Sequence, residues 1–159
     1  MTFTNFSEMV AEYDNVLDAD TCKKIIEKFE YDNRKTRGMT NDDSQTGEPK
    51  ASIKKSTDLW ISQWPEWQEE DHIFFDALSP HVKKYLLHIK EKLGDEIQSV
   101  NDLVDSGYQI QRTDAGEGYG WHSDDDYGAI LDTIVMPIRG YRDSGTVLQA
   151  RRLFTYMFY

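Results

Sequence analysis

The sequence contains a single cysteine, Cys22, in 159 residues. One cysteine can form no disulfide within the chain and no cluster of thiolate metal ligands, so disulfide-stapled folds are excluded. Long apolar runs are also missing. The first 20 residues have neither a basic start nor an apolar stretch, which argues against a signal peptide or a membrane anchor. We therefore expect a soluble, cytoplasmic protein.

Positive charge is scarce: 18 Lys and Arg residues stand against 29 Asp and Glu, for a net charge of -11. Such a surface repels phosphate groups, so neither nucleic acid nor an anionic membrane is expected as a partner. A metal ion or a cationic substrate fits the sign of the charge better. The length suits one domain, and 4 tryptophans, 9 tyrosines and 7 phenylalanines can fill a core.

The N-terminal part of the chain predicts a helix within residues 15–33, capped by Asp18 or Asp20. Its apolar side chains recur at helical spacing: Cys22, Ile25, Ile26 and Phe29. Residues 32–50 hold almost nothing apolar and predict a long loop. Lys54 and Lys55 follow this loop and are most simply read as solvated charges.

A strand is predicted at 57–62, leading into a tryptophan-rich bend at Pro65. The tryptophans of this region could line a groove for an extended peptide, but core packing is the favoured interpretation: Trp60, Trp64 and Trp67. A second helix is predicted over 79–97, with Ser79 as N-cap and Pro80 in the first turn. Its apolar stripe consists of Val82, Tyr85, Leu86, Ile89 and Leu93.

Beyond residue 100 the apolar pattern changes to period two, which predicts a strand within 106–114. A hairpin is expected over 128–145, and residues 152–159 read as a strand that is apolar on both faces. Helices followed by strands favour an α+β fold with helices packed on an antiparallel sheet. Because the sequence stops inside an apolar strand, we expect the fold to be incomplete at its C-terminus.

The segment "GEGYGWHSDDD" contains the strongest chemical signal, a histidine and a carboxylate two residues apart. In an extended segment, His122 and Asp124 point to the same face and can converge on one metal ion. One imidazole and one carboxylate are two of the three protein ligands in the facial site of non-haem Fe(II). Glycines before the pair allow a tight approach, and Tyr119 and Trp121 could wall the site.

The segments "YQIQRTDAGEGYGWHSD" and "RRLFTYMFY" resemble the 2-oxoglutarate- and Fe(II)-dependent oxygenases of the prolyl 4-hydroxylase type. "YDNVLDADTCKKIIEKFE" and "KKSTDLWIS" look like the opening strand and helix and the next strand of that family. The resemblance implies a double-stranded β-helix (jelly-roll) core supported by N-terminal helices. It implies one domain over 1–159, with helical support over about 1–100 and a partial β core over about 104–159.

The resemblance also implies roles for individual residues. His122 and Asp124 match the first two iron ligands. The implied 2-oxoglutarate-binding positions are Tyr159, Tyr119, Arg112 and Thr113, and the implied substrate-binding positions are Trp121 and Tyr127. The implied cofactors are Fe(II), 2-oxoglutarate and O2, to which ascorbate could be added. The implied substrate is a peptide or protein, with a prolyl residue as the target; the oligomeric state is left open.

The sequence departs from the family pattern at its end. In the family, a second iron-binding histidine and a basic residue for 2-oxoglutarate follow the strand at which this sequence stops. The other histidines precede the motif, and we expect them to be helix residues rather than ligands: His72, His81 and His88. Two alternatives to an oxygenase therefore remain. One is a non-catalytic peptide- or partner-binding protein, or an incomplete fragment, on the same scaffold; the other is a metal-dependent hydrolase.

Overall fold

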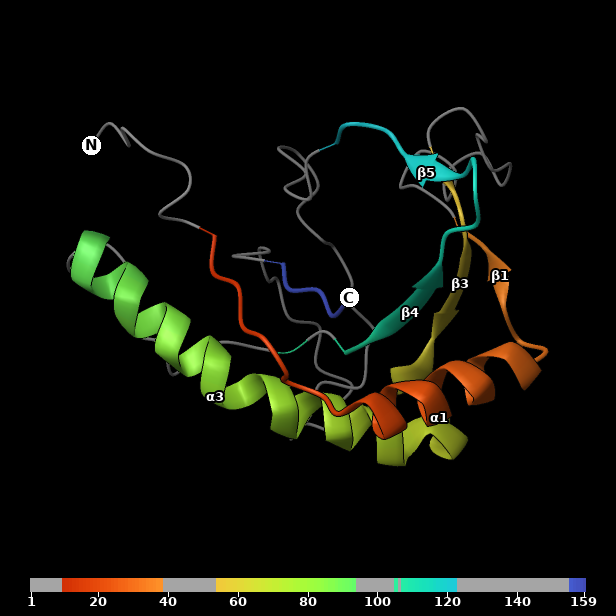
Figure 1. Cartoon of the computed structure of the whole chain (residues 1–159), viewed down its shortest axis with the longest axis horizontal. Helices are drawn as coiled ribbons and strands as arrows, with labels where there is room; N and C mark the ends of the chain where they lie inside the picture. The colour runs from red at the N-terminus through yellow and green to blue at the C-terminus, as the bar shows by residue number, and fades with distance from the viewer. Residues whose placement is uncertain (1–9, 39–53, 94–104, 106, 123–154) are drawn as a thin grey trace, which may run out of the picture. The chain divides into compact units, whose positions relative to one another are not determined.

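A computed structural model describes residues 10–38, 54–93, 105, 107–122 and 155–159. The chain divides into two compact units, the first made of residues 1–31 and 65–104 and the second of residues 32–64 and 105–159. The described elements are mixed α and β, with small antiparallel sheets (Figure 1). The single domain over 1–159 stays a prediction.

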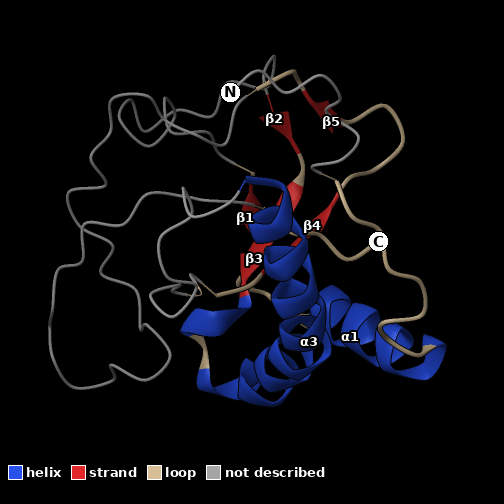
Figure 2. Cartoon of the chain, turned by 90° about the vertical axis from the view of Figure 1, so that its left-hand side faces the viewer, coloured by secondary structure: helices blue, strands red, loops and turns tan. Residues whose placement is uncertain are grey.

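The first unit contains helix α1, Ala19–Tyr31, which confirms the helix predicted within 15–33 (Figure 2). Asp18 is its cap: the carboxylate accepts hydrogen bonds from the Thr21 backbone N–H at 2.9 Å and from the Thr21 hydroxyl at 2.7 Å. The predicted apolar stripe is only partly buried, because Ile25 and Phe29 are buried whereas Ile26 is 58% exposed.

Helix α3, Gln68–Leu93, is longer than the helix predicted over 79–97 and begins eleven residues earlier than Ser79. The cap assigned to Ser79 is wrong: its hydroxyl donates to the Phe75 carbonyl oxygen at 2.6 Å inside the helix. Pro80 also lies within the helix rather than in its first turn. A Ser-Pro pair resembles a helix start because Pro lacks an N–H, yet the helix continues through it.

Two aromatic side chains are buried at and near the start of α3. The short 3-10 helix η3, Pro65–Trp67, leads into it, and Trp67 is fully buried while Phe74 is 7% exposed. Lys28 of α1 joins the same region, with its ammonium 2.6 Å from the Glu70 carboxylate and 4.7 Å from the centroid of the Trp67 ring. Trp67 thus confirms the prediction of core packing, whereas Trp60 is half-buried and Trp64 is 37% exposed, which differs from that prediction.

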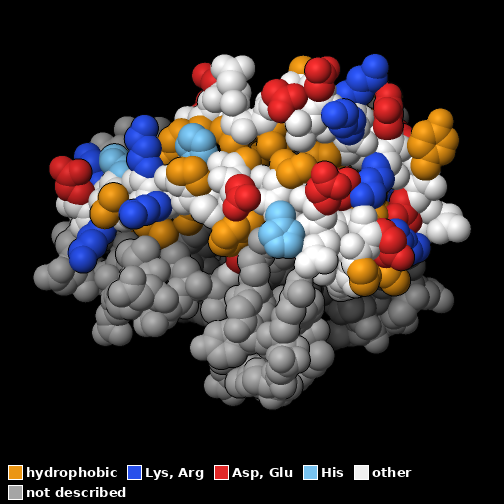
Figure 3. Space-filling view, turned by 90° about the horizontal axis from the view of Figure 1, so that it is seen from below, with side chains coloured by type: hydrophobic (Ala, Val, Ile, Leu, Met, Phe, Trp, Pro, Cys, Tyr) orange, Lys and Arg blue, Asp and Glu red, His pale blue; other side chains and the backbone are white. Residues whose placement is uncertain are grey.

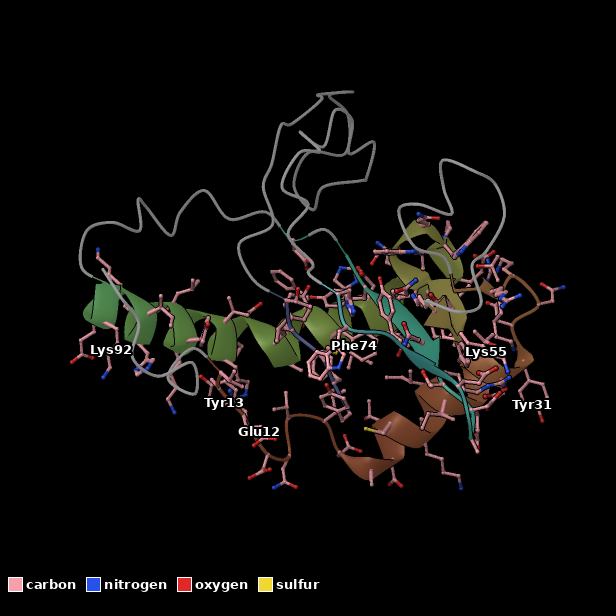
Figure 4. All side chains as sticks on the ribbon, turned by 90° about the horizontal axis from the view of Figure 1, so that it is seen from above. Glu12, Tyr13, Tyr31, Lys55, Phe74 and Lys92 are labelled. Carbon is pink, nitrogen blue, oxygen red and sulfur yellow. The ribbon has the colours of Figure 1, made fainter. Side chains whose placement is uncertain are left out.

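Tyr13 lies beside the middle of helix α3 (Figure 4). Its ring centroid is 4.5 Å from that of His81, and the Lys84 ammonium is 5.5 Å from the Tyr13 ring centroid. His81 is therefore a helix residue in an aromatic contact, as expected; His72 and His88 also lie in α3. On the face drawn in Figure 3, hydrophobic side chains lie among charged ones of both signs.

The second unit contains a three-stranded antiparallel sheet in the order β1-β3-β4. The strands are β1, Thr36–Arg37; β3, Thr57–Trp60; and β4, Gln109–Arg112. Strands β3 and β4 confirm the strands predicted at 57–62 and within 106–114, but a 3-10 helix, η2 (Ile61–Gln63), replaces the last two predicted residues of the earlier strand. The prediction of a loop over 32–50 is also wrong at Thr36–Arg37, because these residues form β1 and pair with β3.

Two further strands form a separate antiparallel pair, β2, Lys54–Lys55, and β5, Gly118–Tyr119. Lys54 pairs with Tyr119 and Lys55 with Gly118, so this pair holds the segment that leads to His122. Within the described residues, no helix is long and apolar enough to cross a membrane.

The C-terminal residues differ from the prediction. Residues 155–159, the described part of the strand predicted over 152–159, are not in a strand, and Met157 and Tyr159 are exposed. Apolar side chains alone do not make a strand, because its N–H and C=O groups need a partner strand. The hairpin predicted over 128–145 lies outside the described residues.

Candidate functional site

His122 follows β5 and its imidazole stacks on the Tyr119 ring, with centroids 3.6 Å apart and planes 17° from parallel. Its Nδ1 atom lies 2.8 Å from the Gly120 carbonyl oxygen. A carbonyl only accepts hydrogen bonds, so Nδ1 carries the hydrogen in this contact. In the neutral imidazole the lone pair is then on Nε2, which is the form that binds a metal ion through that atom.

A tight turn connects the end of β4 to β5. The Glu117 backbone N–H donates to the Asp114 carbonyl oxygen at 2.9 Å, and the Asp114 N–H donates to the Glu117 carboxylate at 3.1 Å. The hydrogen bond from Asp114, followed by the nearby Lys55 ammonium, lowers the pKa of Glu117. Gly116 has a φ of 81° in this turn, a backbone conformation that favours glycine.

A buried polar network centred on Asp58 includes Lys54 of β2. Its carboxylate accepts hydrogen bonds from Lys54 Nζ at 2.7 Å, from the Ser56 hydroxyl at 2.7 Å and from Gln109 Nε2 at 3.1 Å. Lys54, Ser56 and Asp58 are each at most 6% exposed. The reading of Lys54 as a solvated charge is therefore wrong, whereas the Lys55 side chain is 53% exposed and pairs with Glu117.

A signal for this network was present in the sequence. Lys54, Ser56 and Asp58 alternate with other residues, and alternate residues of an extended segment share a face. Opposite charges on one face that also carries a hydroxyl indicate an internal network. The prediction failed because the neighbouring polar loop made solvation the simpler interpretation.

The predicted cofactor-binding residues Arg112 and Thr113 lie at the end of β4. Arg112 pairs with Thr57 across the sheet, and its Nε is 3.2 Å from the Asp114 carboxylate. Thr113 is exposed and accepts a hydrogen bond from the Gln111 amide at 3.3 Å.

The remaining predicted site residues are placed as follows. Tyr159 is fully exposed, and its hydroxyl donates to the Met157 sulfur at 3.4 Å. Trp121 is also fully exposed. Asp124 and Tyr127 lie outside the described residues. The structure thus brings His122 and Tyr119 together, and the convergence of His122 with Asp124 stays a prediction.

Tyr156 anchors the C-terminal residues beside the start of β4. Its hydroxyl donates to the Asp105 carboxylate at 2.8 Å, and its ring centroid is 5.9 Å from that of Tyr108. Burial, followed by the neighbouring Tyr156, raises the pKa of Tyr108 well above its ordinary value. The sequence predicted a strand within 106–114 that included Tyr108, whereas β4 begins at Gln109, and it indicated no role for Tyr156.

Within the described residues, no group of three or more His, Cys, Asp and Glu side chains could hold a metal ion. No protein-family model, curated protein or solved structure matches the chain.

Proposed function

We propose that the chain carries the iron-binding segment of a 2-oxoglutarate- and Fe(II)-dependent oxygenase of the prolyl 4-hydroxylase type, built on a double-stranded β-helix core. The metal would be held by His122 and Asp124. The observation that carries the proposal is the contact between His122 Nδ1 and the Gly120 carbonyl oxygen, because it leaves Nε2 as the metal-binding atom.

The order of elements gives further support. Strand β4 and a turn with Gly116 precede Tyr119 and His122, and the resemblance implies this order of a strand, a glycine-containing turn and an aromatic residue before the ligand pair. The antiparallel pairing of the described strands is compatible with a jelly roll, whose two sheets are antiparallel.

When bound, Fe(II) with 2-oxoglutarate and O2 supplies an oxidant that hydroxylates a C–H bond, with release of succinate and CO2. The residues of the chain have simpler tasks. Tyr119 covers one face of the His122 ring, and the Gly120 carbonyl holds its orientation, so the imidazole is prepared for the metal before binding. The substrate class that the resemblance implies is a peptide or protein with a prolyl residue.

Succinate formation tests the proposal. The full chain is incubated with Fe(II), 2-oxoglutarate and O2, with and without proline-containing peptides, and succinate is measured. His122→Ala should lose this activity, whereas His88→Ala, which changes an exposed histidine of α3, should keep it. Equal succinate formation by the His122→Ala variant would overturn the proposal.

A peptide-binding function without catalysis is the second candidate. It is favoured by the full exposure of Trp121 beside Tyr119, which is 40% exposed, because exposed aromatic side chains often serve as binding surfaces. This function predicts that proline-containing peptides bind in the presence of EDTA and that His122→Ala binds them equally well. Trp121→Ala should then weaken binding.

A further inference from the structure

We propose that Lys54 is a positioning residue for His122 and acts through the Tyr119 ring. The inference deepens the proposed function and rests on it, since it concerns the orientation of the candidate iron ligand. Two contacts in series define the arrangement: the Lys54 ammonium lies 5.4 Å from the Tyr119 ring centroid, and the Tyr119 ring stacks on His122.

The Lys54 ammonium is held in place by the buried network around Asp58. Its ammonium donates to the buried Asp58 carboxylate at 2.7 Å, and that carboxylate is itself held by the Ser56 hydroxyl and the Gln109 amide. Displacement of the ammonium from this buried carboxylate would break a charge-assisted hydrogen bond, so the network restrains the Lys54 side chain. The network thus fixes a positive charge near Tyr119.

The Lys54 ammonium contacts the ring of Tyr119. The face of an aromatic ring attracts a cation, and the attraction strengthens when the cation is removed from water, as the buried Lys54 is. The backbone reinforces the contact, because Lys54 and Tyr119 are directly paired residues of β2 and β5. Tyr119 is therefore held by pairing and by charge, although 40% of its surface is exposed.

The stack between Tyr119 and His122 extends this restraint to the candidate metal ligand. The His122 side chain is exposed, and the stack with Tyr119 together with the Gly120 contact limits the orientations of its ring. Loss of the Lys54 charge near the Tyr119 ring should loosen the tyrosine ring and, through it, the imidazole. This arrangement makes Lys54 more than a packing residue, since its effect on His122 requires the Tyr119 ring.

The test is a double-mutant cycle on the full chain with Lys54→Met, Tyr119→Leu and the double variant. Two quantities are measured: the NMR shifts of the His122 ring protons without metal, and the affinity for Co(II) as a spectroscopic substitute for Fe(II). Lys55→Met is the matched control, because Lys55 is the exposed neighbour on the same strand. Lys54→Met combined with Asp58→Asn serves if the single change prevents folding, since it leaves no buried charge unpaired.

We expect Lys54→Met to move the His122 ring resonances and to weaken Co(II) binding by roughly tenfold, the low end of the loss when groups beyond the ligands are changed. In the Tyr119→Leu background the same change should have no further effect. Lys54→Arg should restore the resonances at least in part, and Lys55→Met should leave them unchanged.

Unmoved His122 resonances in the folded Lys54→Met variants, or an equal effect of Lys54→Met with and without the Tyr119 ring, would overturn the inference. The proposed function fails separately, if the unaltered chain binds no Co(II). In that case the ring resonances of the metal-free protein still decide whether Lys54 orients His122.

Discussion

The imidazole of His122 stacks face to face on the ring of Tyr119, and the two ring centroids are 3.6 Å apart. Tyr119 precedes His122 by three residues in the chain. The same imidazole faces the Gly120 carbonyl oxygen through Nδ1. Two contacts from within one short segment therefore hold the ring directly, and Lys54 can act on it only through Tyr119.

This geometry predicts the tautomer of His122. At a pH where the imidazole is neutral, Nδ1 should carry the hydrogen and Nε2 the lone pair, because the carbonyl can only accept. Long-range 15N–1H NMR distinguishes the two nitrogens, and His122→Ala identifies the resonances. A neutral ring with its hydrogen on Nε2 would contradict the geometry of this contact.

Asp58→Ala should strongly destabilise the protein, because it leaves the buried Lys54 ammonium and two other donors without their acceptor. Removal of one partner of a buried pair costs about 3–5 kcal/mol. Chemical denaturation measures the change in the free energy of unfolding.

The control for this change is Glu27→Ala in α1. Glu27 pairs with Lys23 at 4.0 Å, and both side chains are more than half exposed, so its loss should cost no more than about 0.5 kcal/mol. Equal effects of the two substitutions would show that the Asp58 network contributes no more than a surface ion pair.

Gly38→Ala should destabilise the same network. A Cβ at this position would lie 2.0 Å from the Ser56 hydroxyl oxygen and 2.8 Å from Lys54 Cε, and both side chains are buried. Overpacking of this kind costs about 1–3 kcal/mol. Gly118→Ala is the matched control, since its Cβ would meet nothing within 4 Å. In thermal unfolding, Gly38→Ala should therefore unfold at a lower temperature than Gly118→Ala.

The cap of α1 predicts a pH dependence. Hydrogen bonds from Thr21 lower the pKa of Asp18 from its ordinary value of 3.8. The folded state thus favours the carboxylate, so the stabilisation is present above pH 3.8 and is lost as the pH falls through the lowered pKa. Asp18→Ala should be less stable than the unaltered chain at neutral pH, and the difference should shrink in acid.

Asp18→Asn provides the control for the cap, because asparagine also accepts the hydrogen bond of an N-cap but carries no charge. Its stability relative to Asp18→Ala should not depend on pH in this range. Unfolding followed by circular dichroism at several pH values tests both variants. A difference between Asp18→Ala and the unaltered chain that stays constant into acid would rule out the proposed linkage.

Local patterns in the sequence were sufficient for several elements. The cap at Asp18 and the spacing of Ile25 and Phe29 predicted α1, because both signals act within one or two helical turns. The two-residue period of the side chains predicted β4, the strand that precedes the turn leading to β5 and His122. The pairing of His122 with Tyr119 also belongs to local structure, although the sequence did not predict the stacking itself.

Contacts between distant residues decided the rest. The Ser79-Pro80 pair is a local helix-start signal, but α3 begins at Gln68, and the residues before Ser79 include the buried Trp67 and Phe74. Lys54 looked like a surface charge until Asp58, Ser56 and the distant Gln109 supplied its surroundings.

The sequence by itself therefore determined which segments form α1, β3 and β4, and which residues are candidates for metal chemistry. Only the tertiary structure decided that Lys54 is buried and that its ammonium lies 5.4 Å from the Tyr119 ring centroid. The physical reason is that helix caps and side-chain periodicity act between neighbours in the chain, whereas burial of a charge depends on strands brought together from distant positions.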